Sequence, residues 1–199
     1  MRIITGKFKN RALRMPKGAK IRPTSEMVKK AIFDILGPVV VDSSFLELFA
    51  GSGNVGIEAL SRGAREVVFV DNDRRCMRSV EENLKSLNMA YIYGLDEKAA
   101  SNKTAIKLLP FDAQRALEVL SDRGCKFDIA FLDPPYGEDN LKNCLIKISR
   151  CDILNARCLV VAEHSTRDVI PQRFSNLTLL SSKEYGDSTL SFYQKEIQR

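Results

Sequence analysis

Short apolar segments alternate with longer amphipathic segments along most of the chain. The apolar segments predict strands at residues 44–48, 66–70, 105–109, 127–132 and 158–163. Between them, apolar residues recur at helical spacing within residues 54–62, 73–87, 113–121 and 139–149. Strands that alternate with helices in this way are typical of a parallel sheet covered by helices. We therefore predict an α/β fold.

The two ends of the chain depart from this alternation. Residues 177–195, LTLLSSKEYGDSTLSFYQK, predict two strands joined at residues 186–188, so the far edge of the sheet should be antiparallel. Residues 2–5 and 12–15 predict a small basic hairpin, and the helix after it can be capped by Thr24 and ends at Gly37. Residues 88–104 are polar and aperiodic and predict a loop. We expect a basic extension, residues 1–37, followed by the main domain, residues 38–199.

Composition narrows the class of protein. A length of 199 residues suits one domain with a modest extension, and 44% hydrophobic residues exclude a disordered chain. No apolar run approaches the roughly 18 residues of a membrane span. The first residues lack the apolar core of a secretory signal, so we expect a cytoplasmic protein that does not contact membranes. The five cysteines form no C-x-x-C pair, so we expect neither a metal site nor a disulfide framework.

The charge is concentrated near the start of the chain. Residues 1–30 carry a net charge of +9, whereas the whole chain carries +6. Such a segment is either a solvated surface or a face that neutralises phosphates. On the second interpretation this extension binds a nucleic acid, and its candidate contacts are Arg2, Lys7, Lys9, Arg11, Arg14 and Arg22, with Thr24 beside them.

A glycine array follows the first strand of the predicted sheet. Gly51, Gly53 and Gly56 in ELFAGSGNVGIEAL form G-x-G-x-x-G, which lets a ligand approach the main chain at a helix amino terminus. Asp71 ends the next strand, twenty positions after Gly51, where a carboxylate can accept hydrogen bonds from ribose hydroxyls. The pattern predicts a nucleoside-containing cofactor, and the alternative is a tight turn without a ligand.

Two cofactor classes fit this pattern. A dinucleotide would place a pyrophosphate at the helix terminus, whereas S-adenosylmethionine presents an ammonium and a carboxylate. Glu47, just before the loop, suits the ammonium and would repel a pyrophosphate. Farther along, Asp112 could accept the adenine amino group while the amide of Ala113 meets a ring nitrogen. Asp112 could equally cap the next helix, and the two roles are compatible.

The strand at residues 127–132 continues directly into Asp133-Pro134-Pro135-Tyr136. The prolines make a rigid loop at the carboxyl end of the strand, where open α/β sheets bind ligands. The exocyclic amine of a base is a poor nucleophile because its lone pair is delocalised into the ring. Hydrogen bonds to the Asp133 carboxylate and the Pro134 carbonyl would aim that lone pair at a methyl carbon, and Tyr136 would stack on the base. The alternative is a stiff turn.

Five ordered segments together resemble one family. They are RIITGKFKNRAL, IRPTSEMVKKAIFDIL, FLELFAGSGNVGIEALSRGA, DPPYG and YGDSTLSFY. Over nearly the whole chain they are similar to the bacterial 16S ribosomal RNA guanine-N2 methyltransferases. The resemblance implies a Rossmann-like class I methyltransferase fold with a seven-stranded, mostly parallel sheet. It also implies S-adenosylmethionine as the methyl donor and one guanine of the small-subunit RNA as the acceptor.

The resemblance also implies site residues. Its cofactor-binding positions here are Glu47, Ala50, Gly51, Ser52, Gly53, Asn54, Gly56, Asp71, Asn72, Asp112 and Ala113. Among these, Asp71 and Asn72 match contacts to the ribose. Asp133, Pro134, Pro135 and Tyr136 match the catalytic motif, and Arg22-Pro23-Thr24 matches a segment near cofactor and substrate. Residues 88–104 depart from the family by being longer and more polar.

Other functions remain open on sequence alone. D-P-P-Y also serves methyltransferases that act on adenine N6 or on other amines. A dinucleotide-dependent oxidoreductase would use the glycine array and Asp71 but not Glu47, and a non-catalytic RNA-binding assembly factor could keep the fold. For the guanine-N2 function we expect a monomer that acts on 16S RNA within a partly or fully assembled 30S subunit, because shape dominates RNA recognition.

Overall fold

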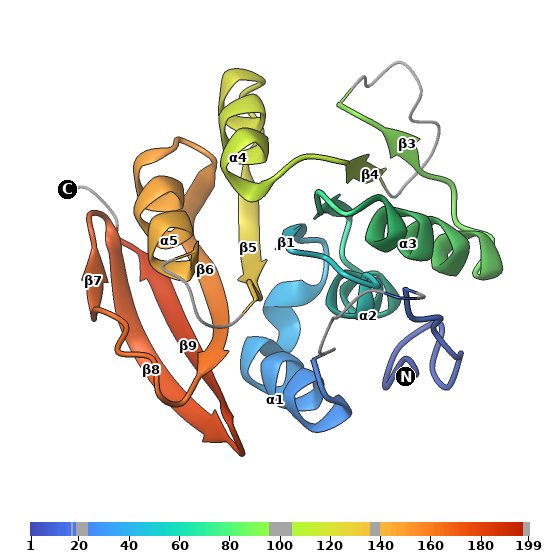
Figure 1. Cartoon of the computed structure of the whole chain (residues 1–199), viewed down its shortest axis with the longest axis horizontal. Helices are drawn as coiled ribbons and strands as arrows, with labels where there is room; N and C mark the ends of the chain where they lie inside the picture. Colours follow the sequence, from blue (N-terminus) through green and yellow to red (C-terminus); the bar gives the residue numbers. More distant parts are fainter. Residues whose placement is uncertain (17, 19–23, 96–104, 136–139, 197–199) are drawn as a thin grey trace.

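One mixed sheet organises the part of the chain that the computed structural model describes, which is residues 1–16, 18, 24–95, 105–135 and 140–196. Its strands are β1 (Ser44–Leu48), β2 (Glu66–Val70), β3 (Ile92–Tyr93), β4 (Ala105–Leu109), β5 (Phe127–Leu132), β6 (Leu154–Ser165), β7 (Arg173–Phe174), β8 (Leu177–Tyr185) and β9 (Ser188–Lys195). Their order is β3-β4-β2-β1-β5-β6-β9-β8-β7 (Figure 1). In this order, adjacent strands from β3 through β6 pair parallel. The pairs β6-β9, β9-β8 and β8-β7 at the far edge are antiparallel.

Helices cover both faces of this sheet. They are α1 (Glu26–Leu36), α2 (Asn54–Ser61), α3 (Arg74–Ser86), α4 (Ala113–Asp122) and α5 (Asn140–Arg150), with a short 3-10 helix, η1 (Gly37–Val40). One apolar cluster joins α1, α2 and α3 to one face, and a second joins α4 and α5 to the other. Side chains alternate along each strand, so Phe45 belongs to the first cluster and Leu46 to the second. None of the described helices is long and apolar enough to cross a membrane.

The predicted alternation of strands and helices is confirmed, with helix boundaries within one residue. The sheet nevertheless has nine strands in the described residues, not seven. β3 lies within the predicted loop, and β3 and β7 are each two residues long, which is too short to produce a period. β6 also extends beyond the predicted 158–163. The predicted antiparallel far edge is confirmed, because β9 pairs antiparallel with both β6 and β8.

The predicted amino-terminal hairpin is confirmed only as a short antiparallel pair, not as two strands. Arg2 and Ala12 form a bridge, and three backbone hydrogen bonds join the two sides: Ile3 N donates to the Arg11 carbonyl at 3.0 Å, Asn10 N to the Ile3 carbonyl at 2.8 Å and Leu13 N to the Met1 carbonyl at 3.0 Å. The residues between the two sides of this pair form hydrogen bonds with α2. Lys7 N donates to the Ser61 carbonyl at 2.7 Å, and Phe8 N donates to the Ser61 hydroxyl at 2.9 Å. Gly6 permits this approach, because a Cβ there would lie 1.8 Å from the Ser61 carbonyl oxygen.

The predicted cap of the first helix is wrong by one residue. Ser25, not Thr24, is the N-cap of α1, and its hydroxyl accepts from the Val28 amide at 3.1 Å. Ser25 has the extended backbone of a cap residue, with φ of −64° and ψ of 158°. Thr24 is therefore available for another contact, which lies in the candidate site.

A buried ion pair ties the amino-terminal segment to the helices. Lys29 of α1 and Glu58 of α2 lie 3.2 Å apart, and both side chains are fully buried. The Glu58 carboxylate also accepts from the backbone amides of Ile4 at 2.7 Å and Thr5 at 3.0 Å, and it pairs with Arg62 at 3.0 Å. Burial lowers the pKa of Lys29, and the Glu58 carboxylate opposes that change.

Two further acceptors complete the surroundings of the Lys29 ammonium. These are the backbone carbonyl of Arg2 at 2.8 Å and the side-chain oxygen of Asn54 at 2.7 Å. Each proton of this ammonium thus has an acceptor nearby, which offsets the cost of burying the charge. The amino-terminal segment, α1 and the start of α2 are held as one unit by this cluster.

Removal of Lys29 tests the importance of this cluster for stability. Lys29→Ala should lower the free energy of unfolding by about 3 kcal/mol, because it removes the buried cation from a buried carboxylate. The neighbouring lysine provides a matched control: Lys30 pairs with Asp34 on the surface, and its side chain is 66% exposed. Lys30→Ala should therefore cost less than about 1 kcal/mol. Urea unfolding measures both, and equal small losses would contradict a stabilising role for the buried pair.

Candidate active site

Four carboxylates gather at one edge of the sheet. Glu47 lies in β1, Asp71 follows β2, Asp112 follows β4 and Asp133 follows β5. These strands are neighbours in the order β4-β2-β1-β5 and run parallel, so their carboxyl ends meet at the same edge. This is the edge at which open α/β sheets bind ligands.

The glycine loop between β1 and α2 has the backbone that its sequence predicts. Gly51 and Gly53 have φ of 55° and 73°, in the left-handed region that favours glycine. At position 56 glycine is needed for lack of space: a Cβ there would lie 2.5 Å from the Phe69 ring and 2.6 Å from the Glu47 carboxylate. Gly56 therefore lets α2 pack closely on β2. That any of these glycines contacts a cofactor stays a prediction.

Glu47 is buried beneath the start of α2. Its two oxygens accept from the backbone amides of Val55 at 3.3 Å and Gly56 at 3.0 Å. The side chain of Glu47 points to α2 because it lies on the same face of β1 as Phe45, which belongs to the α2 cluster. Burial raises its pKa to about 8, although the two amides oppose that rise. The residue is 2% exposed, so the acid lies under the loop rather than on its surface.

Asp71 fastens the glycine loop to β2. Its carboxylate accepts from the Gly51 amide at 2.9 Å with one oxygen and from the Asp73 amide at 2.9 Å with the other. Burial raises the pKa of Asp71, and these two amides oppose the rise. The loop and the predicted ribose acceptor are thus held in a fixed relation.

A cleft of about 790 Å³ opens beside Asn72, the residue after Asp71, and its walls come from the loop after β1 and from α4 and α5. Three predicted cofactor residues, Asn72, Asp112 and Ala113, line it. Pro135 of the predicted catalytic motif also lines it. Asp112 caps α4 by accepting from the Arg115 amide at 2.9 Å, so the predicted cap role is confirmed. Its adenine contact stays a prediction.

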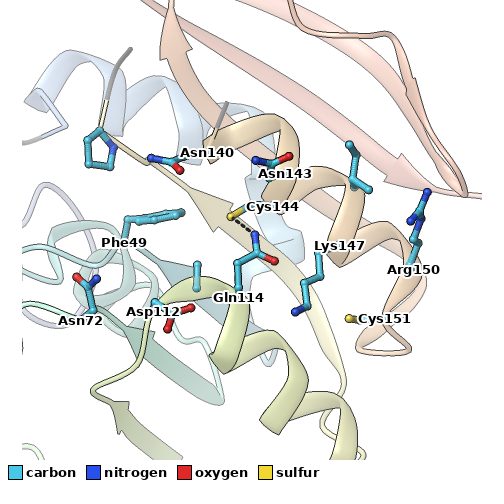
Figure 2. A pocket seen from close by; sticks show the side chains of 13 residues that line it. Phe49, Asn72, Asp112, Gln114, Asn140, Asn143, Cys144, Lys147, Arg150 and Cys151 are labelled. Atoms are coloured by element: carbon cyan, nitrogen blue, oxygen red, sulfur yellow. Dashed lines mark hydrogen bonds between the residues drawn. The ribbon is translucent and has the colours of Figure 1, made fainter. Parts of the chain in front are cut away.

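The cleft also contains residues that sequence reasoning missed. Figure 2 shows the Phe49 ring near Asn140, and Gln114 of α4 reaching Cys144 of α5. Phe49 has φ of 60°, which is rare for a bulky residue and typical of functional sites. An aromatic residue two positions before the first glycine of the array was the available signal. Gln114 and Asn140 carried no recognisable motif.

Thr24 lies beside the predicted catalytic aspartate, 109 positions away in the sequence. Its hydroxyl donates to the Asp133 carboxylate at 3.4 Å, and its carbonyl accepts from the side-chain amide of Asn54 at 3.2 Å. Asn54 in turn accepts from Lys29, so the buried cluster reaches the site. Thr24 is 6% exposed, which separates it from the exposed basic residues with which it was grouped.

The other predicted site residues differ in placement. Pro134 is buried and Pro135 exposed, whereas Tyr136 and Arg22 lie outside the described residues. The remaining predicted RNA contacts are all exposed on the amino-terminal segment, and they are Arg2, Lys7, Lys9, Arg11 and Arg14. Ala50, Ser52 and Asn54 lie buried in and after the glycine loop.

Comparisons with known proteins identify the family of this chain. The sequence model of the family described as Conserved hypothetical protein 95 matches residues 1–194. The Bacillus subtilis protein YlbH, provisionally named an rRNA methyltransferase, is 37% identical and aligns over 98% of this chain and 99% of its own length. The ribosomal RNA small subunit methyltransferase D of Escherichia coli K12 is 29% identical, over 100% of this chain and 91% of its own.

A solved structure has the same fold over the whole chain. The Escherichia coli protein yhhF, provisionally described as a methyltransferase, superimposes with a TM-score of 0.81 at 30% identity. The match covers 100% of this chain and 99% of that one. With a family model that spans nearly all of the sequence and a full-length structural match, this chain belongs to the family described as Conserved hypothetical protein 95.

Proposed function

We propose that this protein transfers a methyl group from S-adenosylmethionine to the exocyclic N2 of a guanine in 16S ribosomal RNA. The observation that carries the proposal is the placement of Asp133 and Pro134 at the end of β5, next to the glycine loop that follows β1. The full-length relative named ribosomal RNA small subunit methyltransferase D supports the same reaction.

The charges at the site favour S-adenosylmethionine over a dinucleotide. Glu47 already occupies the amides of Val55 and Gly56 at the start of α2, which are the donors that a pyrophosphate would need. Three more carboxylates, Asp71, Asp112 and Asp133, lie at the same edge of the sheet. An acidic edge suits a cofactor that carries a sulfonium and an ammonium, and it repels one that carries phosphates.

The described residues suggest how that cofactor is held. Asp71 and Asn72 would contact the ribose, while Asp112 and Ala113 would meet the adenine in the cleft. Phe49, at the entrance to the glycine loop, would cover one face of the base. The methionine part would lie along the loop residues, which are Ala50, Gly51, Ser52, Gly53 and Asn54, above the buried Glu47.

The cofactor supplies an electrophilic methyl group, and the protein supplies the position of the acceptor. The Asp133 carboxylate and the Pro134 carbonyl would accept the two hydrogens of the guanine amine, which turns its lone pair towards the methyl carbon. The nitrogen would become cationic as the N–C bond forms and the bond from the methyl carbon to sulfur breaks, with S-adenosylhomocysteine as the leaving group. The proton would then be lost from nitrogen to Asp133 or to water. Tyr136 would stack on the base.

The amino-terminal residues 1–37 would form the extension that binds RNA. Their cations suit a phosphate backbone, and the segment that carries most of them is attached to α2 through Ile4 and to α3 through Arg14. We propose that the substrate is RNA already shaped in a partly or fully assembled 30S subunit and that the enzyme acts as a monomer.

Methylation of adenine N6 or of another amine is the second candidate function. The Pro134 carbonyl and the Asp133 carboxylate could accept hydrogen bonds from any amino group in the same position.

Identification of the modified nucleoside tests the proposal. The purified protein should transfer radiolabel from S-adenosylmethionine to 30S particles from unmodified cells, giving N2-methylguanosine at one site. Asp133→Ala should lose activity by about a hundredfold or more while retaining cofactor affinity. Asp122→Ala at the exposed end of α4 should remain fully active. Label in adenosine or in protein would contradict the guanine assignment, and equal turnover on bare transcript would contradict the need for an assembled substrate.

A second test examines whether Thr24 orients Asp133. Thr24→Val keeps the shape of the side chain but removes the hydroxyl that donates to the Asp133 carboxylate. We expect kcat to fall about tenfold with the affinity for S-adenosylmethionine unchanged, because the lost hydrogen bond involves a charged group. Thr24→Ser restores the hydroxyl and should restore kcat. Equal activity of the valine and serine variants would show that the contact has no catalytic consequence.

A third test uses the protonation of Glu47. Its pKa near 8 means that this acid is mostly protonated at pH 7 before the cofactor binds. A nearby ammonium favours the carboxylate, so binding should lower the pKa of Glu47 and release up to about one proton at pH 7. Calorimetry in buffers of different ionisation enthalpy measures this release. Glu47→Gln should lack it, and at pH 9 wild type should lack it too; identical proton release in both proteins at pH 7 would contradict the contact.

A further inference from the structure

A groove distinct from the cleft lies between the amino-terminal segment and α3. Its volume is about 730 Å³. One wall is formed by Arg14, Met15 and Pro16, and the other by residues of a single face of α3, which are Arg75, Arg78, Ser79 and Glu82. Three arginines and one carboxylate thus line a groove that also has an apolar side chain, Met15.

The two walls of the groove are fixed relative to each other. The Arg14 amide donates to the side chain of Asn83 at 2.7 Å, and the Arg14 carbonyl accepts from Ser79 at 3.0 Å and from Asn83 at 3.0 Å. Asn83 is 1% exposed. Because the backbone of Arg14 is bound from both sides, its side chain projects from a rigid support.

The groove also adjoins the candidate active site. The same Asn83 amide that contacts Arg14 donates to the carbonyl of Ser52 in the glycine loop at 3.0 Å. In addition, α3 begins three positions after Asp71, at the edge of the sheet where the carboxylates gather. A ligand in the groove therefore lies next to the cofactor loop.

The three arginines differ in their availability. The Arg75 guanidinium is held by Asp73 at 2.6 Å and by the Gly18 carbonyl at 2.9 Å. Arg14 has only a surface pair with Glu82, at 3.3 Å, with the two side chains 72% and 46% exposed. Arg78 is exposed, and within the described part of the chain its guanidinium has no hydrogen bond or ion pair. Arg14 and Arg78 are thus available to an anion, since an exposed pair such as Arg14 with Glu82 is weak.

We propose that this groove binds the sugar-phosphate backbone of the RNA strand that flanks the target base. Arg14 and Arg78 contact phosphate oxygens, and Met15 packs against sugar or base. Arg75, held by Asp73 and the Gly18 carbonyl, is not one of the proposed phosphate contacts. The proposal rests on the proposed function and adds to it a second RNA-binding wall, on α3, that the charge of residues 1–30 does not include.

Binding of 30S particles from unmodified cells to the full-length protein, measured from about 50 to 300 mM KCl, tests this proposal. At the lower concentrations, Arg78→Ala and Arg14→Ala should each weaken binding about five- to tenfold. Each should also reduce the slope of log K against log salt by about 0.7 to 0.9, the share of one phosphate contact. The matched control is Arg123→Ala, because this exposed arginine follows α4 at the opposite edge of the sheet. It should bind RNA within about twofold of wild type.

The outcomes separate this proposal from the proposed function. Unchanged affinity for S-adenosylmethionine in every variant, with weaker RNA binding only for the two groove variants, supports the groove. If wild type binds and methylates RNA but Arg78→Ala and Arg14→Ala behave like Arg123→Ala, the groove is overturned and the proposed function stands. If wild type neither binds nor methylates 30S particles from unmodified cells, both are overturned together.

Discussion

The buried carboxylate of Glu58 attaches the amino-terminal segment to α1 and α2. It binds two backbone amides of the first five residues, the ammonium of Lys29 and the guanidinium of Arg62. A segment with little secondary structure of its own is thereby attached to α1 and α2. Without these contacts its amides would need water, and the terminus would fray as most chain ends do. Its exposed cations therefore project from a defined surface.

The same cluster links that surface to the site. Lys29 binds Asn54, Asn54 binds the carbonyl of Thr24, and the Thr24 hydroxyl reaches Asp133. Asn83 makes a second connection, from Arg14 to the glycine loop. A methyltransferase that must hold a base at an electrophilic carbon requires its RNA contacts and its acceptor site in one fixed frame. Buried side-chain amides and one ion pair provide that frame here.

The sequence predicted the sheet and the site to different extents. The four central strands, β1, β2, β4 and β5, are buried on both faces and appear in the sequence as apolar runs. Their bounds could therefore be predicted, and so could the position of the carboxylates at the ends of these strands. The amino-terminal segment could not be predicted in the same way. Its amides pair with Glu58 and Ser61, and the hydrophobic pattern does not reveal hydrogen bonds to side chains more than fifty positions away. The net charge of +9 for residues 1–30 likewise includes Lys29, which is fully buried and therefore does not belong to a charged surface.

Native-state hydrogen exchange at the amides of Ile4 and Thr5 tests this account most directly. Both donate to the buried Glu58 carboxylate, so they should exchange only through opening of the α1 and α2 core and show protection close to that of the central strands. In Glu58→Gln that protection should fall while the strands keep theirs. Exchange of these amides in wild type as fast as in an unattached terminus would contradict the fixed frame on which the account depends.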